Sequence, residues 1–207
     1  MFAERPIKKL ARDLRGDELR ITIACPEEEV ASAFAEIFHS ARGVEVYACD
    51  LLRLPRDALV SPANSFGDMG GGFDAQIDRH YGGAAQPAVM ERIREEFLGE
   101  LPVGSATILE MKTRAFRYLV CAPTMRVPGY LGSSINAYLA MRAVLVEVWR
   151  QRHFYPIRTI AAPALCTGVG GMAATEAASQ MLAAYRSVIE EGWREASHPA
   201  LAPLALR

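Results

Sequence analysis

The sequence contains few cysteines and no cysteine pair. Its four cysteines, Cys25, Cys49, Cys121 and Cys166, stand apart, and each lies at or near the end of an apolar run. The four histidines show no metal-ligand spacing with them, which argues against a zinc site. We therefore expect reduced, mostly buried cysteines and no bound metal.

A strong charge imbalance is also missing. The 23 Lys and Arg residues face 24 Asp and Glu residues, so the net charge is −1. No global positive field would draw the chain to nucleic acid or to anionic lipid. No apolar run is long enough to cross a bilayer, and the first 20 residues lack the apolar core of a signal peptide. We expect a cytoplasmic protein that binds neither nucleic acid nor a membrane.

What the sequence does have is a regular alternation of strand and helix patterns. Both faces of the expected strands are apolar, which is typical of a largely parallel sheet covered by helices on both sides. The sequence therefore predicts one α/β domain, a three-layer α/β/α sandwich. We expect strands at 19–25, 44–49, 58–60, 105–109, 118–122 and 159–165, and helices at 26–42, 74–81, 87–98, 135–153 and 173–191.

Two glycine-rich loops follow expected strands and precede expected helices, at 70–72 and 167–171. Glycine lets a backbone approach a ligand closely, and exposed N–H groups before a helix form a nest for phosphate. Because parallel sheets bind ligands at the carboxyl ends of their strands, the two loops together predict a diphosphate site. For either loop alone, a tight turn is the alternative.

Other phosphate and hydrolase motifs are missing. The turn after the first strand has no G-x-G-x-x-G, and the chain contains neither G-x-x-x-x-G-K-[ST] nor G-x-S-x-G. These absences argue against a Rossmann dinucleotide enzyme, a P-loop nucleoside triphosphatase and an α/β-hydrolase.

An ordered set of motifs resembles the signature of macro domains, which bind ADP-ribose on an α/β/α sandwich. The family's "GDI", "VNAAN", "GGGVD", "IHRAAG" and "STGVFG" are similar to DL at 50–51, LVSPAN at 59–64, GGGFD at 70–74, IDRHYG at 77–82 and CTGVGG at 166–171. The resemblance implies a single macro-like domain over 1–207, with a core at 44–192, an N-terminal βα extension at 1–43 and a loose C-terminal tail at 193–207.

The resemblance also implies a binding site for ADP-ribose or an ADP-ribosylated protein, without a cofactor or metal. Asp50 would accept a hydrogen bond from the adenine amino group, and Asn64 would bind the distal ribose; a helix cap and an Asn turn are their alternatives. The glycine loops would hold the two phosphates. The implied ligand-binding residues are Asp50, Leu51, Ala63, Asn64, Gly70, Gly71, Gly72, Phe73, Thr167, Gly168, Val169, Gly170 and Gly171.

Asp74 bears on whether the protein is an enzyme. It stands ten positions after Asn64, as in the branch of the family that removes ADP-ribose from proteins. By this resemblance Asp74 and Asn64 would be catalytic, and the bond at the anomeric carbon of the distal ribose would be hydrolysed in a protein ADP-ribosyl ester or in ADP-ribose 1″-phosphate. A helix N-terminal acid is the alternative role for Asp74. A non-catalytic ADP-ribose reader and a structural accessory protein are the alternative functions.

Besides the added βα unit at 1–43, the chain departs from the family pattern in two places. Gly170 stands where hydrolases often carry an aromatic residue over the distal ribose, and Phe66 or Phe73 would have to substitute. No clear strand follows residue 192, where the family usually places an aromatic that stacks on adenine. Tyr130 and Trp193 are candidates for that stacking role, with packing as the alternative.

Overall fold

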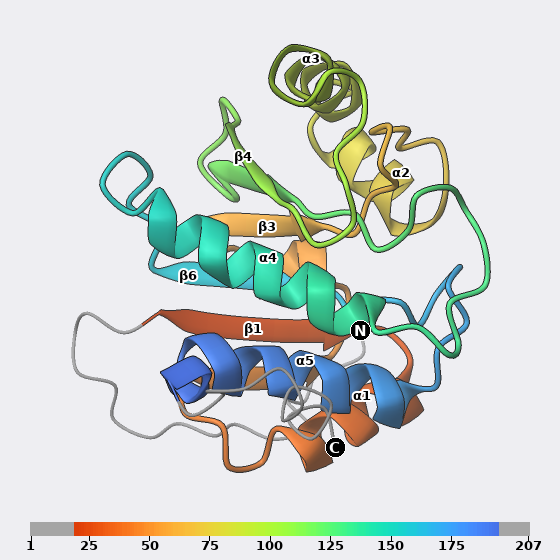
Figure 1. Cartoon of the computed structure of the whole chain (residues 1–207), viewed down its shortest axis with the longest axis vertical. Coiled ribbons are helices and arrows are strands. Elements are labelled where there is room, and N and C mark those ends of the chain that lie inside the picture. The colour runs from red at the N-terminus through yellow and green to blue at the C-terminus, as the bar shows by residue number, and fades with distance from the viewer. Residues whose placement is uncertain (1–18, 195–207) are drawn as a thin grey trace.

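The computed structural model describes residues 19–194, which form a regular succession of strands and helices (Figure 1). The strands of this part are β1 (Arg20–Cys25), β2 (Val44–Ala48), β3 (Ala58–Ser61), β4 (Thr107–Glu110), β5 (Tyr118–Cys121) and β6 (Thr159–Ala162). Its helices are α1 (Glu28–Ile37), α2 (Gly72–His80), α3 (Ala85–Phe97), α4 (Asn136–Arg150) and α5 (Ala174–Val188), with short 3-10 helices η1 (Leu51–Arg53) and η2 (Gly192–Arg194).

The six strands form one sheet in the order β2-β1-β6-β3-β5-β4. All neighbours are parallel except β4, which runs antiparallel to β5 at the edge. The expected mixed, largely parallel sheet is therefore confirmed. Parallel pairing brings the carboxyl ends of β1, β2, β3, β5 and β6 to one rim, which is where both glycine-rich loops leave the sheet.

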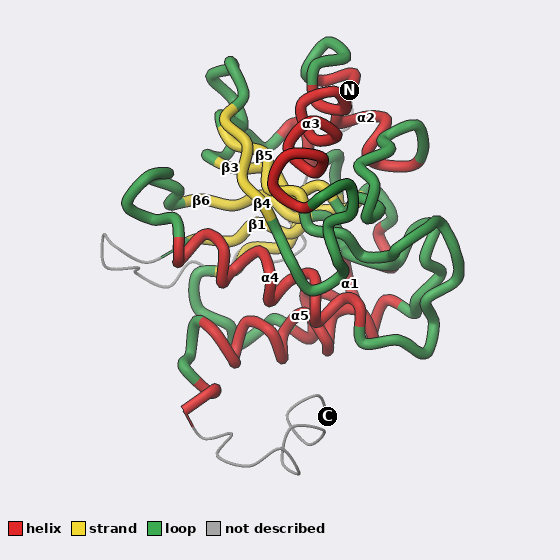
Figure 2. The backbone as a smooth tube through the Cα atoms, turned by 45° about the horizontal axis from the view of Figure 1, so that its top comes forward, coloured by secondary structure: helices red, strands yellow, loops and turns green. Residues whose placement is uncertain are grey.

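Helices cover both faces of the sheet, which confirms the three-layer sandwich (Figure 2). One core joins α1, α4 and α5 to alternate strand residues such as Ala58 and Val60. The second core joins α2 and α3 to the opposite face, where Leu59 packs with Ile77 and Val89. Because side chains alternate along a strand, Ser61, two residues after Leu59, also faces the α2 side of the sheet.

β1 lies inside the sheet, between β2 and β6, rather than at an edge. Its residues Ile21 and Ile23 are buried in the first core, so the strand of the βα unit at the front of the chain belongs to the central layer. Within residues 19–194 no strand follows α5. Most of the expected loose tail, residues 195–207, and the first 18 residues lie outside the described part of the chain.

Two element boundaries differ from expectation in ways that affect the site. α2 begins at Gly72 rather than at Asp74, so Asp74 falls in its first turn. β6 ends at Ala162 rather than at residue 165, because Pro163 has no N–H to donate to the sheet.

The four cysteines are free thiols; Cys25 is partly exposed and the other three are buried. Among residues 19–194 no helix is long and apolar enough to span a membrane.

Candidate functional site

The two glycine-rich loops meet at the carboxyl rim of the sheet. They leave β3 and β6, which are neighbouring parallel strands. A β-carbon added to Gly72 would lie 3.6 Å from Cγ2 of Val169, so the two loops face each other with room for little more than a methyl group at this point. The cleft between them has a volume of about 160 Å³. Its lining residues are Pro62, Ala63, Gly71, Gly72, Phe73, Asp74, Thr124, Met125, Pro163, Ala164, Cys166, Gly168, Val169 and Gly170.

The side chain of Asn64 shapes the first loop. Its Oδ1 accepts hydrogen bonds from the N–H groups of Phe66 at 3.0 Å and Asp68 at 3.3 Å, and its Nδ2 donates to the Asp68 carbonyl at 2.7 Å. The Asp68 carboxylate in turn accepts from the Gly70 N–H at 2.9 Å. The Asn turn is therefore present in this structure. A role of Asn64 toward a ribose stays a prediction.

The first loop leads directly into α2, whose N-terminus lies at the cleft. Gly71 occupies the N-cap in an extended conformation without a side-chain cap, and Gly72 has a φ of +56°. The N–H groups in the first turn of a helix have no partner within the helix, and the helix dipole adds positive potential there. This end of α2 is therefore suited to bind an anionic group.

The second loop is folded tightly on itself, and Gly170 is the reason that it fits. A β-carbon at this position would lie 2.6 Å from the Cys166 carbonyl oxygen, which is a clash with backbone. The Gly171 N–H donates to the Gly168 carbonyl at 2.9 Å, and the Met172 N–H donates to the Cys166 carbonyl at 3.0 Å. The loop geometry thus explains why an aromatic side chain is missing at this position.

Asp74 projects from the first turn of α2 toward the end of β3. Its Oδ1 accepts a hydrogen bond from the Ser61 hydroxyl at 2.6 Å, and the backbone of Ala63 also hydrogen-bonds to the carboxylate. Burial raises the pKa of Asp74 to about 6, although the bonds from Ser61 and Ala63 oppose this shift. A carboxyl group with this pKa changes its ionisation close to neutral pH, as a general base does.

Asp50 lies at the same rim but further along it, at the end of β2. Its Oδ1 accepts from the Leu52 N–H at 3.0 Å, so it caps η1, which was the alternative role. β1 and β6 separate β2 from β3, and neither Asp50 nor Leu51 lines the cleft. Leu51 is buried in the second core. An adenine-binding role for Asp50 stays a prediction.

Of the other predicted residues, the structure brings seven into the cleft lining and leaves four beside it. Gly70, Asn64, Thr167 and Gly171 belong to the two loops but do not line the cleft. The Thr167 hydroxyl donates to the Ala164 carbonyl at 2.8 Å. The seven lining residues are Ala63, Gly71, Gly72, Phe73, Gly168, Val169 and Gly170.

The loop after β5 supports the second glycine loop. The Leu131 N–H donates to the Gly170 carbonyl at 2.7 Å. Tyr130 is 80% exposed, and its ring flanks Gly171, where a β-carbon would lie 3.0 Å from Cδ2 of Tyr130. In the same loop, the Arg126 guanidinium forms a bidentate ion pair with the Glu100 carboxylate, with hydrogen bonds of 2.8 and 3.0 Å. Tyr130 therefore stands beside the second loop, whereas Arg126 is an exposed, paired arginine.

The sequence analysis did not predict that the loop directly after β5 forms one wall of the cleft. Thr124 and Met125 line it, and the Thr124 carbonyl accepts from Nδ2 of Asn136 at 2.7 Å. Asn136 is the first residue of α4, and its N–H donates to the Ser134 hydroxyl at 3.4 Å. The position of Thr124 just after an expected strand was the available signal.

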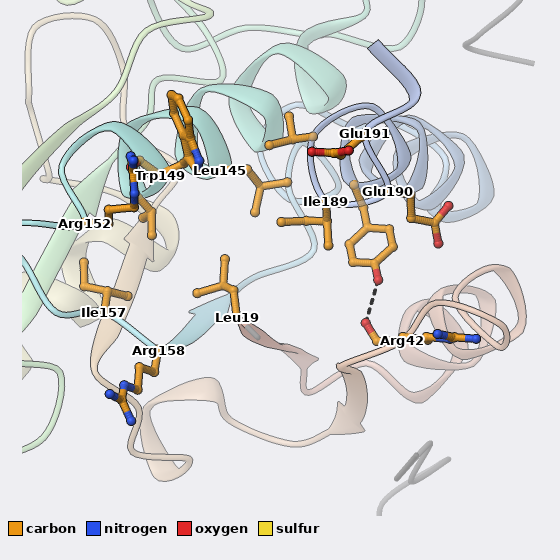
Figure 3. Close-up of a pocket in the computed structure, with 13 residues that line it drawn as sticks. Leu19, Arg42, Leu145, Trp149, Arg152, Ile157, Arg158, Ile189, Glu190 and Glu191 are labelled. Atoms are coloured by element: carbon orange, nitrogen blue, oxygen red, sulfur yellow. Dashed lines mark hydrogen bonds between the residues drawn. The ribbon is translucent and has the colours of Figure 1, made fainter. Parts of the chain in front are cut away.

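A larger hollow lies at the opposite end of the strands (Figure 3). Its volume is about 760 Å³, and Leu19 and Arg158 line it just before β1 and β6. The Tyr185 hydroxyl donates to the Arg42 carbonyl at its edge, at 2.6 Å. Because parallel α/β sheets bind ligands at the carboxyl ends of their strands, the smaller cleft is the candidate site. Within residues 19–194 no cluster of three or more His, Cys, Asp or Glu could hold a metal ion.

The architecture and the paired loops define an α/β/α sandwich with a cleft between two glycine-rich loops at its carboxyl rim. The Macro domain family matches residues 60–181, so the chain belongs to the macro domain family. A protein from Aeropyrum pernix is 32% identical over 144 residues, which are 70% of each chain.

Solved structures share the fold at lower identity. The macrodomain of Mycobacterium tuberculosis DarG has a TM-score of 0.52 and 24% identity, over 67% of this chain and 87% of that chain. A mutant Oceanobacillus iheyensis macrodomain, solved with ADPR (ADP-ribose), has a TM-score of 0.54 and 22% identity, over 66% of this chain and 72% of that chain. Some macrodomains of this fold thus bind ADP-ribose.

Proposed function

We propose that the cleft binds ADP-ribose or a closely related ADP-ribosyl group, with the diphosphate between the two glycine loops. The observation that carries the proposal is that both loops line one cleft at the N-terminus of α2, where Gly72 and Val169 face each other. Backbone N–H groups and the helix dipole supply the attraction for phosphate. Macro domain membership and the ADP-ribose-bound O. iheyensis macrodomain support the choice of ligand.

The size of the cleft suggests how such a ligand lies. At about 160 Å³ it is smaller than the roughly 300 Å³ at the lower end of ligand pockets, so it encloses only part of the nucleotide. We place the diphosphate and distal ribose in the cleft. The adenosine then extends along the rim over β6 and β1 toward Asp50 at the end of β2.

For the chemistry, we propose that Asp74 acts as the general base in hydrolysis at the anomeric carbon of the distal ribose. The carboxylate takes a proton from water, the water oxygen bonds to the anomeric carbon, and the bond from that carbon to its substituent breaks. The substituent leaves as a protein carboxylate or as phosphate, and ADP-ribose is released. Asp74 lines the cleft, and its pKa of about 6 leaves it mostly ionised at neutral pH.

A non-catalytic reader is the second candidate function. The observation in its favour is that Ser61 and Ala63 both bond to Asp74, which would also suit a carboxylate that fastens α2 to β3. In a reader, the same cleft binds the ADP-ribosyl group and releases it unchanged.

Two measurements test these proposals. Titration calorimetry with free ADP-ribose is expected to give a Kd in the micromolar range, about −8 kcal/mol; no heat at millimolar ligand would reject binding. Incubation with an ADP-ribosylated protein is expected to release ADP-ribose, and Asp74→Asn should abolish release while changing the Kd less than tenfold. A wild-type protein that binds ADP-ribose but releases none from acidic-residue or 1″-phosphate linkages is a reader.

A further inference from the structure

Ser61 and Asp74 form a short contact between buried or partly buried side chains at the cleft. Ser61 is the last residue of β3 and is 0% exposed. Its hydroxyl donates to Oδ1 of Asp74 at 2.6 Å, which lies in the range of charge-assisted O–H···O⁻ bonds. A buried hydroxyl that donates to a cleft carboxylate controls where that carboxylate can point.

Cys121, on the neighbouring strand β5, lies beside Ser61. Ser61 is in register with Cys121, the last residue of β5, so their side chains are neighbours on the α2 face of the sheet. Burial raises the pKa of the Cys121 thiol well above its ordinary range, so the thiol keeps its proton.

We propose that Ser61 is a positioning residue for Asp74: its hydroxyl fixes the carboxylate in the cleft and favours its ionised form. This inference rests on the proposed hydrolytic function. An ionised carboxylate has about four lone-pair sites, and Ser61 and Ala63 occupy two of them. The remaining sites are left for the attacking water.

The charged and titratable neighbours set the direction of the effect. Burial and the nearby carboxylate of Asp68 raise the pKa of Asp74, whereas the bonds from Ser61 and Ala63 lower it. Cys121 contributes no charge while it is protonated. Removing the Ser61 hydroxyl therefore removes one of the two interactions that stabilise the carboxylate, and Asp74 should hold its proton to higher pH.

The test compares Ser61→Ala with a matched control, Ser65→Ala. Within the described residues, the Ser65 hydroxyl is buried without a hydrogen-bond partner, so its removal should leave Asp74 unaffected. The pKa of Asp74 is read by carbon NMR of labelled aspartate carboxyl groups, with the Asp74 signal assigned from Asp74→Asn. The acid limb of the pH profile of ADP-ribose release gives a second reading.

In Ser61→Ala we expect the NMR titration and the acid limb to move together to higher pH by about one unit, which is a tenfold change in the ionisation constant. Ser61→Cys keeps a weak hydrogen-bond donor, so the pKa of Asp74 should shift less than in Ser61→Ala. It also replaces the alanine variant if that variant does not fold. Unchanged titration in both Ser61 variants overturns the inference, even if the wild type is an active hydrolase. A wild type that releases no ADP-ribose overturns the hydrolytic function and the role of Ser61 in it. The NMR titration does not depend on turnover. It therefore shows separately whether the Ser61 hydroxyl affects the pKa of Asp74.

Discussion

Val169 and Gly72 come from loops almost a hundred residues apart and face each other across the cleft, with 3.6 Å between Cγ2 of Val169 and the position that a β-carbon on Gly72 would take. The Val169 side chain is 64% exposed, so this contact is an outer edge of the cleft and not part of the core. Any side chain added to the first loop at this point must compete with a ligand for the same space.

Gly71→Glu should abolish ADP-ribose binding without unfolding the protein. Gly71 is exposed, and a β-carbon there would meet no atom within 4 Å, so a side chain can be added without a clash. The new carboxylate would place negative charge in the anion site, and we expect at least a hundredfold rise in the calorimetric Kd. Gln76→Glu is the control, because it adds the same charge on an exposed position of α2 outside the cleft lining. Normal affinity in a folded Gly71→Glu would show that the phosphate is not bound here.

Asp50→Ala should weaken adenosine-containing ligands selectively. If the adenosine extends along the rim to the end of β2, losing the carboxylate should raise the Kd for ADP-ribose about tenfold, as expected for a lost hydrogen bond to a charged group. Ribose 5-phosphate lacks the base, so its affinity should not change. Because Asp50 also caps η1, a loss of about 1 kcal/mol in unfolding free energy is expected alongside. Equal losses for both ligands count against the adenine role.

The contribution of Asp74 to the stability of the fold should fall as the pH rises from about 4 to about 6. The folded-state pKa of Asp74 is raised to about 6 by burial, whereas an unfolded Asp titrates near about 3.9. In this window the folded state binds more protons than the unfolded state, so the free energy of unfolding decreases with pH. Asp74→Asn removes the dependence.

Urea unfolding at pH 4 and pH 7.5 checks this prediction. The stability of Asp74→Asn relative to the wild type should increase between the two pH values by at most about 3 kcal/mol. Asp78→Asn, on the same helix, is the control for replacing a carboxylate. A constant difference between Asp74→Asn and the wild type at both pH values contradicts the raised pKa.

Gly170→Ala should destabilise the fold, and Gly168→Ala should not. A β-carbon at position 170 would lie 2.6 Å from the Cys166 carbonyl oxygen, which is backbone and cannot turn aside. Overpacking of this kind costs about 1–3 kcal/mol. A β-carbon at Gly168 would meet nothing within 4 Å, so its effect should stay within about 0.5 kcal/mol. Equal unfolding midpoints for the two variants would refute the packing explanation for the missing aromatic.

The sequence predicted the elements of the site better than its internal contacts. Strand ends followed by glycine loops were enough to expect the cleft, because parallel strands bring their carboxyl ends to one rim. The partners of individual side chains were not predictable in the same way. Asn64 satisfies its amide within its own loop, and Asp74 bonds to Ser61, thirteen positions earlier, because both face the α2 side of the sheet.

The sequence by itself determined the sandwich, the two glycine loops and the acid after the first of them, since periodicity and motif order are local properties of the chain. Only the tertiary structure decided that β1 lies between β2 and β6, that Val169 closes on Gly72, and that Gly170 fits against a carbonyl where a side chain would clash. These contacts join residues far apart in the chain, and they depend on strand order and backbone approach, which no local pattern encodes.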